Sequence, residues 1–159
     1  MRETTLCYIE NGERNAYLML HRNKKKNDEN EDKWIGVGGK IESGETPEEC
    51  LLREVKEETG VTLTAYRYRA VIDFSSDEWG EERMHLYTAT SYTGAITEEC
   101  DEGELVWLPK AELRRKKLWE GDKLFLSLLE ADADFFTLAL SYAGEKLVRA
   151  TLNGEEILP

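Results

Sequence analysis

Cysteine, proline and long hydrophobic runs are all scarce in this chain of 159 residues. Its cysteines are Cys7, Cys50 and Cys100, and no two of them share a Cys-x-x-Cys spacing. An odd, scattered set of this kind favours reduced, buried thiols over a catalytic cysteine, and hence a cytoplasmic protein. No apolar stretch approaches the ~20 residues of a membrane span, and no signal peptide pattern follows the first residues. We therefore expect no membrane partner.

Positive charge is also in short supply. The chain has 21 Lys and Arg residues against 33 Asp and Glu residues, which gives a net charge of −12. An acidic surface repels polyphosphate backbones, so we expect no duplex nucleic acid as a partner. A phosphorylated small molecule would need a positive mediator, and a bound divalent cation can supply it.

What the sequence does contain fits one α/β domain over residues 1–159. Hydrophobic residues make up 40% and charged residues 34% of the chain, and this length can bury a core without disulfides or metal staples. We see no repeat, linker or low-complexity segment. Monomer and homodimer are both left open.

The hydrophobic pattern predicts more strands than helices. Strands are expected at 4–9, 16–21, 34–40, 63–74, 84–93, 104–108, 136–142 and 146–152, and longer helices at 47–59 and 122–130, with Asp122 as a possible cap of the second. Asn11-Gly12 predicts a tight turn with positive φ angles. Residues 23–33 form a polar loop, either a solvated connector or a lid. Residues 75–82 form an acidic loop with an exposed Trp79 at its tip, for packing or for a substrate or dimer contact.

The first helix has clear boundaries. Thr46 is expected as N-cap, Pro47 as the first helical residue, and Glu49 as the partner in a capping box. Gly60 is expected to end the helix. Leu52, Val55 and Thr59 share one face, whereas Arg53 and the glutamates at 54, 57 and 58 share the other.

Glu54, Glu57 and Glu58 are three or four residues apart, so their carboxylates can converge on one side of the helix. Like charges placed together are costly unless a cation lies between them. Mg²⁺, or Mn²⁺ in its place, takes carboxylate oxygens and leaves positions for waters and substrate phosphates. Arg53 can reach Glu57 and orient it, and the preceding glycines can offer a backbone carbonyl.

The alternative is a solvated helix face with ion pairs, which is the usual meaning of a Glu/Lys/Arg-rich segment. The spacing opposes it. The fixed positions are Gly39-x5-Glu45-x7-Arg53-Glu54-Val55-x-Glu57-Glu58-x-Gly60-Val61. Even seven of these nine residues coincide by chance only about once in 10⁸ starting positions, or about a hundredfold more often in a Glu-rich chain.

This segment resembles a complete Nudix box with no substitution. The resemblance implies an α/β/α sandwich with a mixed sheet, and Mg²⁺-dependent hydrolysis of a nucleoside diphosphate linked to another group. It also implies that Glu54, Glu57 and Glu58 are metal ligands, that Arg53 orients them, and that the Gly38 carbonyl is a further ligand. Which carboxylate acts as general base stays open.

Flanking segments are similar to MutT-type enzymes, which hydrolyse oxidised purine nucleoside triphosphates such as 8-oxo-dGTP. They are 34–40, 100–104, 107–109 and 119–122. The similarity implies that Glu102 reaches the metal, that Trp119 stacks on the base and that Asp122 reads its edge. An indole face suits a purine, and a carboxylic acid can pair with amide and amino edges. Trp119 as a core residue and Asp122 as an N-cap are the alternatives.

The chain departs from this group at two places. Ile35 stands where mammalian-type members carry Asn, and Gly121 stands where they carry Asp. Other basic groups are candidates for phosphate or substrate contacts, namely Lys40, His21 and Arg22, although such residues are more often ordinary surface groups.

The sequence thus predicts a nucleoside triphosphate pyrophosphohydrolase that releases a monophosphate and pyrophosphate. Within the same chemistry, the substrate could instead be ADP-ribose, a dinucleoside polyphosphate or an RNA 5′ end, although the acidic surface disfavours RNA. A nucleotide sensor that does not cleave its ligand would not need three metal carboxylates, and a plain interaction domain would leave the box unexplained.

Overall fold

The structure is a computed structural model that describes residues 1–24 and 30–158. Its strands are β1 (Arg2–Asn11), β2 (Ala16–His21), β3 (Trp34–Ile35), β4 (Val37–Lys40), β5 (Thr62–Ser76), β6 (Gly80–Thr93), β7 (Glu99–Cys100), β8 (Gly103–Pro109), β9 (Phe136–Ala143), β10 (Lys146–Leu152) and β11 (Glu155–Glu156). The helices are α1 (Pro47–Thr59), the 3₁₀ helix η1 (Lys110–Arg115) and α2 (Glu120–Glu130).

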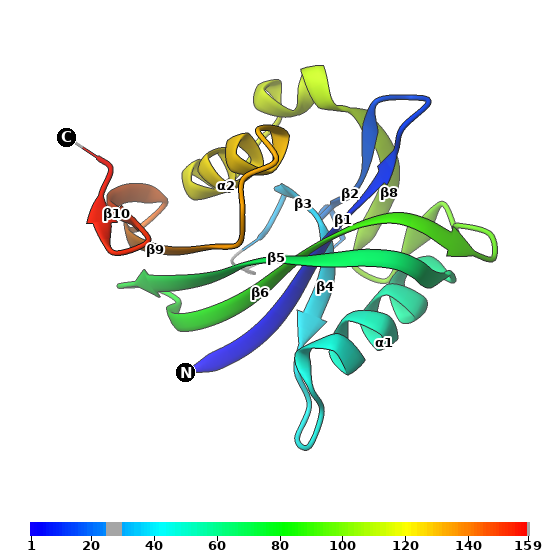
Figure 1. Cartoon of the computed structure of the whole chain (residues 1–159), viewed down its shortest axis with the longest axis horizontal. Helices are drawn as coiled ribbons and strands as arrows, with labels where there is room; N and C mark the ends of the chain where they lie inside the picture. Colours follow the sequence, from blue (N-terminus) through cyan, green and yellow to red (C-terminus); the bar gives the residue numbers. More distant parts are fainter. Residues whose placement is uncertain (25–29, 159) are drawn as a thin grey trace.

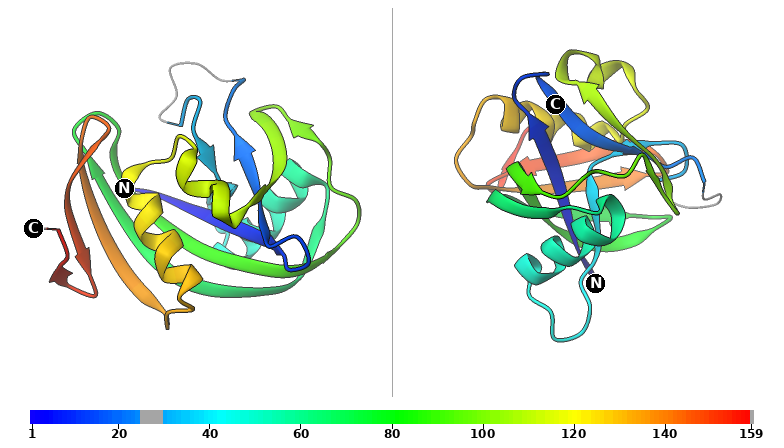
Figure 2. Two further views of the ribbon diagram at one scale, coloured as in Figure 1. Left: turned by 90° about the horizontal axis from the view of Figure 1, so that it is seen from above. Right: turned by 90° about the vertical axis from the view of Figure 1, so that its right-hand side faces the viewer.

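The strands form one mixed sheet. Its order among the described residues is β11-β10-β9-β5-β6-β1-β2-β8-β7, with β3 on β2 and β4 on β1. The β1–β6 and β5–β9 pairs are parallel and the other pairs are antiparallel. Helices α1 and α2 lie on opposite sides of the sheet (Figures 1 and 2). The predicted α/β/α sandwich with a mixed sheet is confirmed.

The central strands divide the core into two layers. Leu6 and Tyr8 of β1 pack into the cluster that contains α2, whereas Cys7 and Ile9 pack into the cluster that contains α1. Strand β2 alternates in the same way, which explains why its sequence is apolar throughout. Cys7, Cys50 and Cys100 are all free thiols.

The first hairpin differs from the predicted two-residue turn. Asn11 still pairs with Ala16 in the strands, so the turn consists of residues 12–15. The Asn15 N–H donates to the Gly12 carbonyl at 3.3 Å, and Asn15, not Gly12, has a positive φ of 47°. The Asn11 side chain accepts the Arg14 N–H at 3.2 Å, so its role is to stabilise the longer turn.

The predicted boundaries of α1 are confirmed. The Thr46 hydroxyl accepts the Glu49 N–H at 3.1 Å, and the Glu49 carboxylate accepts the Thr46 N–H at 3.0 Å. Pro47 begins the helix, and Gly60 ends it with a left-handed φ of 85°. Glu58 is buried, because the glycines of β4 pack against that side of the helix.

Other predictions need correction. Strands β5 and β6 continue their pairing to Ser76 and Gly80, so the predicted acidic loop shrinks to three residues, 77–79, and Trp79 is only partly exposed. Asp122 is not the N-cap of α2, because the helix begins before it and Trp119 occupies the cap position. Phe125, Leu126 and Leu129 form the buried face of α2, and Leu124 and Leu128 are half-buried.

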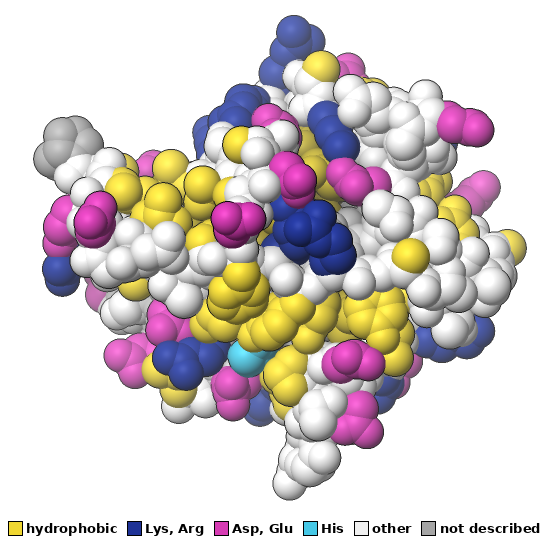
Figure 3. Space-filling view, viewed as in Figure 1, with side chains coloured by type: hydrophobic (Ala, Val, Ile, Leu, Met, Phe, Trp, Pro, Cys, Tyr) yellow, Lys and Arg dark blue, Asp and Glu magenta, His cyan; other side chains and the backbone are white. Residues whose placement is uncertain are grey.

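The polar loop predicted at 23–33 lies partly outside the described residues, at 25–29. Within the described ranges, neither α1 nor α2 has the length and apolar character of a membrane-spanning helix. On the face in Figure 3, hydrophobic side chains form a band between charged groups. Tyr68 of β5 and Phe135 are among the exposed large hydrophobic residues, and they meet edge to face with ring centroids 5.0 Å apart.

Candidate active site

A cavity of about 420 Å³ lies between β4 and the start of α2. Gly38, Gly39 and Lys40 line it near α1, and Trp119, Asp122 and Tyr142 line it near α2. We call these the α1 end and the α2 end. The two segments with the predicted chemistry, far apart in the sequence, therefore face one space.

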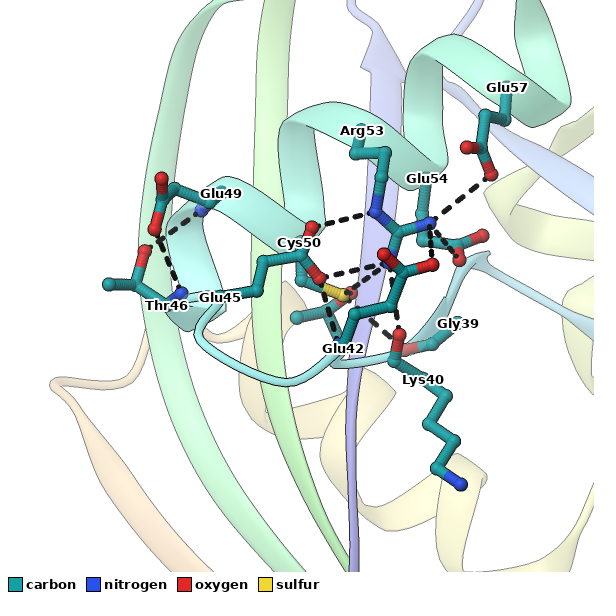
Figure 4. Close-up of polar contacts among 11 residues, drawn as sticks. Gly39, Lys40, Glu42, Glu45, Thr46, Glu49, Cys50, Arg53, Glu54 and Glu57 are labelled. Carbon is teal, nitrogen blue, oxygen red and sulfur yellow. Dashed lines mark hydrogen bonds and ion pairs between the residues drawn. The ribbon is translucent and has the colours of Figure 1, made fainter.

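At the α1 end, Arg53 organises the carboxylates (Figure 4). Its Nε and Nη2 donate to the two oxygens of Glu45 at 2.7 and 2.9 Å. Its Nη1 donates to Glu54 at 2.8 Å and to Glu57 at 3.2 Å, and its Nη2 also donates to the Lys40 carbonyl at 3.0 Å. The bond from Arg53 is the main reason why the pKa of Glu45 is lowered to about 2. Arg53 thus fixes the glycine loop and three glutamates together.

The glycines of β4 are required by close contacts. A Cβ on Gly38 would lie 1.9 Å from the Thr5 carbonyl oxygen of β1. A Cβ on Gly39 would lie 2.4 Å from the Cδ of Glu54. Glycine at these positions lets β4 pack on β1 and lets the Glu54 carboxylate lie against the strand.

Glu58 and Glu102 come together from different elements. Glu58 Oε2 accepts the Gly38 N–H at 3.1 Å, and Arg22 Nη1 donates to Glu102 Oε2 at 3.1 Å. Burial raises the pKa of Glu58, and the nearby carboxyls of Glu102 and Glu54 raise it further. Burial also raises the pKa of Glu54, although Arg53 opposes this change.

The donor set suits a hard divalent cation. Neighbouring carboxyls gain stability from a shared cation, and their oxygens are the ligands that Mg²⁺ prefers. The convergence is incomplete, however: within the described residues, no three His, Cys, Asp or Glu side chains are close enough to enclose an ion. Glu57 is the outlier, because its side chain is 59% exposed and turns toward Arg53. The structure thus brings Glu54 and Glu102 near Glu58, whereas Glu57 points toward Arg53.

At the α2 end, Asp122 is a buried carboxyl with 4% exposure. Its backbone N–H donates to the Trp119 carbonyl at 3.1 Å, but its carboxyl group forms no hydrogen bond or ion pair with another described residue. Burial is the main reason why its pKa is raised to about 8; Glu82 raises it further and Lys33 lowers it. Asp122 therefore keeps its proton at neutral pH and can donate as well as accept.

Trp119 is held on three sides. Its Nε1 donates to Asn30 Oδ1 at 2.9 Å, the Lys33 ammonium lies 4.2 Å from its ring centroid, and the Tyr142 ring meets it edge to face at 5.0 Å. It is half-buried and lines the cavity. A ring fixed in this way can stack on a planar ligand with little loss of entropy.

The remaining predicted contacts divide into two groups. Ile35, Lys40 and Arg22 line the cavity. His21 is not among the lining residues: its Nε2 pairs with Asp32 Oδ1 at 2.8 Å and its ring stacks on Trp34 at 4.4 Å. As β2 alternates its faces, adjacent residues 21 and 22 point in different directions.

Two residues of the site were given no role from the sequence. Glu45 is part of the box, and its fixed spacing from Arg53 was an available signal. Tyr142 carried no signal, because the parallel β5–β9 pairing, not local sequence, brings it next to Ser76 at the cavity.

Curated relatives match part of the chain. "Uncharacterized Nudix hydrolase YvcI" of Bacillus subtilis is 31% identical over 100 residues, covering 60% of this chain and 63% of the relative. "Oxidized purine nucleoside triphosphate hydrolase" of Danio rerio is 32% identical over 100 residues, covering 61% and 62%. "NAD-capped RNA hydrolase NudC" of Photobacterium profundum is 36% identical over 80 residues, covering 48% and 28%. The chain thus spans less than two thirds of each relative's length.

The fold has a solved counterpart over nearly its whole length. The crystal structure of "mMutator MutT protein" from Bacillus halodurans superimposes with a TM-score of 0.84 at 24% identity, covering 98% of this chain and 99% of that one. The family model described as "NUDIX domain" matches residues 1–129, which include α1 and every cavity-lining residue named above except Tyr142. The chain therefore belongs to the Nudix family.

Proposed function

We propose that this protein is a Mg²⁺-dependent nucleoside triphosphate pyrophosphohydrolase that acts on oxidised purine nucleotides such as 8-oxo-dGTP. The observation that carries the proposal is one cavity, which runs from the glycines of β4 to the ring of Trp119 and the neutral carboxyl of Asp122. The carboxyls of Glu54 and Glu58 lie against those glycines, next to the α1 end. Phosphates at one end and a purine at the other would place a triphosphate chain along β4.

Glu54, Glu57, Glu58, Glu102 and the Gly38 carbonyl would hold Mg²⁺, or Mn²⁺ in its place. The bound cation would supply charge neutralisation for the phosphates and a more acidic water. Arg53 keeps Glu54 in place, and Arg22 does the same for Glu102. One glutamate accepts a proton from the water that attacks phosphorus. The phosphorus–oxygen bond to the leaving group breaks, and a nucleoside monophosphate and pyrophosphate are released.

Trp119 and Asp122 would select the base. The indole offers its face to the purine, and the protonated Asp122 donates to an acceptor on the purine edge while its carbonyl oxygen accepts from a donor. Ile35 contributes an apolar contact, and Lys40 lies where it can meet a phosphate. This set requires a small nucleotide rather than duplex nucleic acid.

The test is a hydrolysis screen with Mg²⁺ over 8-oxo-dGTP, dGTP, ADP-ribose, dinucleoside polyphosphates and capped RNA. We expect the highest kcat/KM for 8-oxo-dGTP, with pyrophosphate as a product. Trp119→Ala should lower that value by about 10-fold or more, because base–aromatic stacking contributes about 1–3 kcal/mol, whereas Trp119→Phe should retain most of it. Equal rates on 8-oxo-dGTP and dGTP would refute the preference for oxidised bases. Nucleotide binding without hydrolysis would indicate a sensor.

A further inference from the structure

The C-terminal hairpin of β9 and β10 contributes a wall of the cavity from outside the segment that the family model matches. Tyr142, near the end of β9, lines the cavity and is 6% exposed. Its ring stacks on Phe74 with centroids 6.5 Å apart and meets Trp119 edge to face. Both neighbours also line or border the α2 end, so Tyr142 lies where the base is proposed to bind.

Helix α2 obtains its N-terminal cap from this hairpin. Trp119 at the cap position provides no side-chain hydrogen bond to the first turn. Instead, the Gly121 N–H donates to Tyr142 Oη at 2.8 Å, and the Glu120 carboxylate accepts the Leu147 N–H of β10 at 3.2 Å. The first turn of a helix has N–H groups without intrahelical partners, and here the hairpin satisfies one of them.

Gly121 and Tyr142 occupy one another's space. A Cβ on Gly121 would lie 2.6 Å from Tyr142 Oη and 2.5 Å from Leu140 Cδ1. A side chain at 121 therefore cannot coexist with the phenol in its present place. This contact explains why glycine stands one residue before Asp122, where the resemblance led us to expect a second carboxylate.

The tip of the hairpin is fixed at two points. The Gly144 N–H donates to Asp77 Oδ1 at 2.9 Å, which ties it to the β5–β6 turn. Glu145 forms an ion pair with Lys33, whose side chain is 5% exposed and whose ammonium covers the Trp119 ring. These contacts hold Tyr142 against the start of α2.

We propose that the β9–β10 hairpin forms the closing wall of the base-binding end and that Tyr142 is a positioning residue, which holds Asp122 and Trp119 through its bond to Gly121. The inference rests on the proposed function, because it assumes that a purine occupies the α2 end. Tyr142 does not touch the reacting phosphorus, so it should govern nucleotide affinity rather than the chemical step.

Tyr142→Phe tests the inference, because it keeps the ring and removes only the acceptor for Gly121. We expect KM for 8-oxo-dGTP with Mg²⁺, and the Kd of 8-oxo-dGMP measured by tryptophan fluorescence without added metal, to rise about 3- to 10-fold. The value of kcat should change less than about twofold. Tyr66→Phe is the matched control: it removes a hydroxyl bond of 3.0 Å to Glu48, which lies outside the cavity, and should leave both constants unchanged.

Gly121→Ala supplies a second route, because its methyl group displaces the phenol. We expect Gly121→Ala to raise KM as well. In the double variant with Tyr142→Phe, the loss of nucleotide-binding free energy should be smaller than the sum of the losses in the two single variants. If Tyr142→Phe keeps the wild-type KM and Kd, or if Tyr66→Phe raises both constants by as much, the role of the hairpin is wrong. Either result would leave the proposed function standing. A wild-type protein that neither hydrolyses nor binds any purine nucleotide would overturn the proposed function and this inference with it.

Discussion

At the α1 end of the cavity Arg53 donates hydrogen bonds to Glu45, Glu54 and Glu57, whereas at the α2 end the carboxyl of Asp122 has no such partner among the described residues. In the first arrangement, Arg53 lowers the pKa of Glu45 to about 2 and holds the glutamates of α1 close together, which suits a cation. The second keeps one carboxyl protonated, which suits a neutral base. The two ends thus use carboxyl groups in different surroundings: several are gathered around an arginine at the α1 end, and one is buried by itself at the α2 end.

Glu58→Gln should give the largest effect, because it removes a charged oxygen from the cluster without changing its shape. We expect hydrolysis to fall at least about 100-fold. The metal-free protein should keep its thermal stability, since Gln has the same shape as the protonated Glu58 side chain. The increase in Tm on adding Mg²⁺ should shrink. Glu130→Gln, on the exposed side of α2, is the control. Wild-type activity in Glu58→Gln would show that Glu58 is not a ligand of the metal.

Arg53→Lys should have the next largest effect. A lysine cannot reproduce the two-point contact with Glu45 or bond to Glu54 at the same time. We expect kcat/KM to fall about 10- to 100-fold, as is typical when groups that orient metal ligands are lost. Arg83→Lys is a matched control, because Arg83 also bonds both oxygens of an aspartate, Asp73, at 2.8 and 3.0 Å.

The Arg83–Asp73 pair is exposed on the surface, and neither residue lines the cavity. Its loss should leave activity unchanged and lower Tm less than Arg53→Lys does. Equal effects of the two substitutions would show that Arg53 acts only as a structural ion pair.

The α1 end could be predicted from sequence and the α2 end only in part, for a physical reason. Residues 39–61 form one contiguous segment whose capping box, glycine stop and glutamate spacing are local properties. The α2 end combines Trp119 and Asp122 with Tyr142 and Lys33, which meet only through sheet pairing and hairpin contacts. Even at the α1 end, spacing alone placed all three glutamates on one side of the helix. Glu58 is buried and Glu57 is exposed because only one side of α1 faces β4, and the sequence does not show which side that is.

The buried carboxyl of Asp122 predicts that the free energy of unfolding depends on pH. The pKa of this carboxyl is raised from 3.8 to about 8 in the folded chain. Between these values the folded state binds more protons than the unfolded state, so the free energy of unfolding should decrease as pH rises, by at most about 1.4 kcal/mol per pH unit. Below about pH 4 the group is protonated in both states and contributes no slope.

Asp122→Asn should remove that contribution and stabilise the protein most near pH 8, as measured by urea unfolding from pH 5 to 8.5. Exposed Asp134→Asn should leave the slope unchanged. Binding of 8-oxo-dGMP to the wild type should weaken above about pH 8, when Asp122 ionises near Glu82. A slope that is the same in wild type and Asp122→Asn would show that the carboxyl is ionised, and the contrast between the two ends would then fail.

The smallest effect is expected at His21, where sequence and structure disagree. His21 and Arg22 are adjacent basic residues at the end of β2, and both were predicted to contact substrate. Arg22 lines the cavity and bonds Glu102, whereas His21 stacks on Trp34 and pairs with Asp32 outside the lining set. His21→Gln should therefore change kcat/KM by less than about twofold, whereas Arg22→Gln should lower it about 10-fold or more through Glu102. A large loss in His21→Gln alone would mean that the α1 end extends across β2 to the opposite side, because only then could residue 21 reach the phosphates.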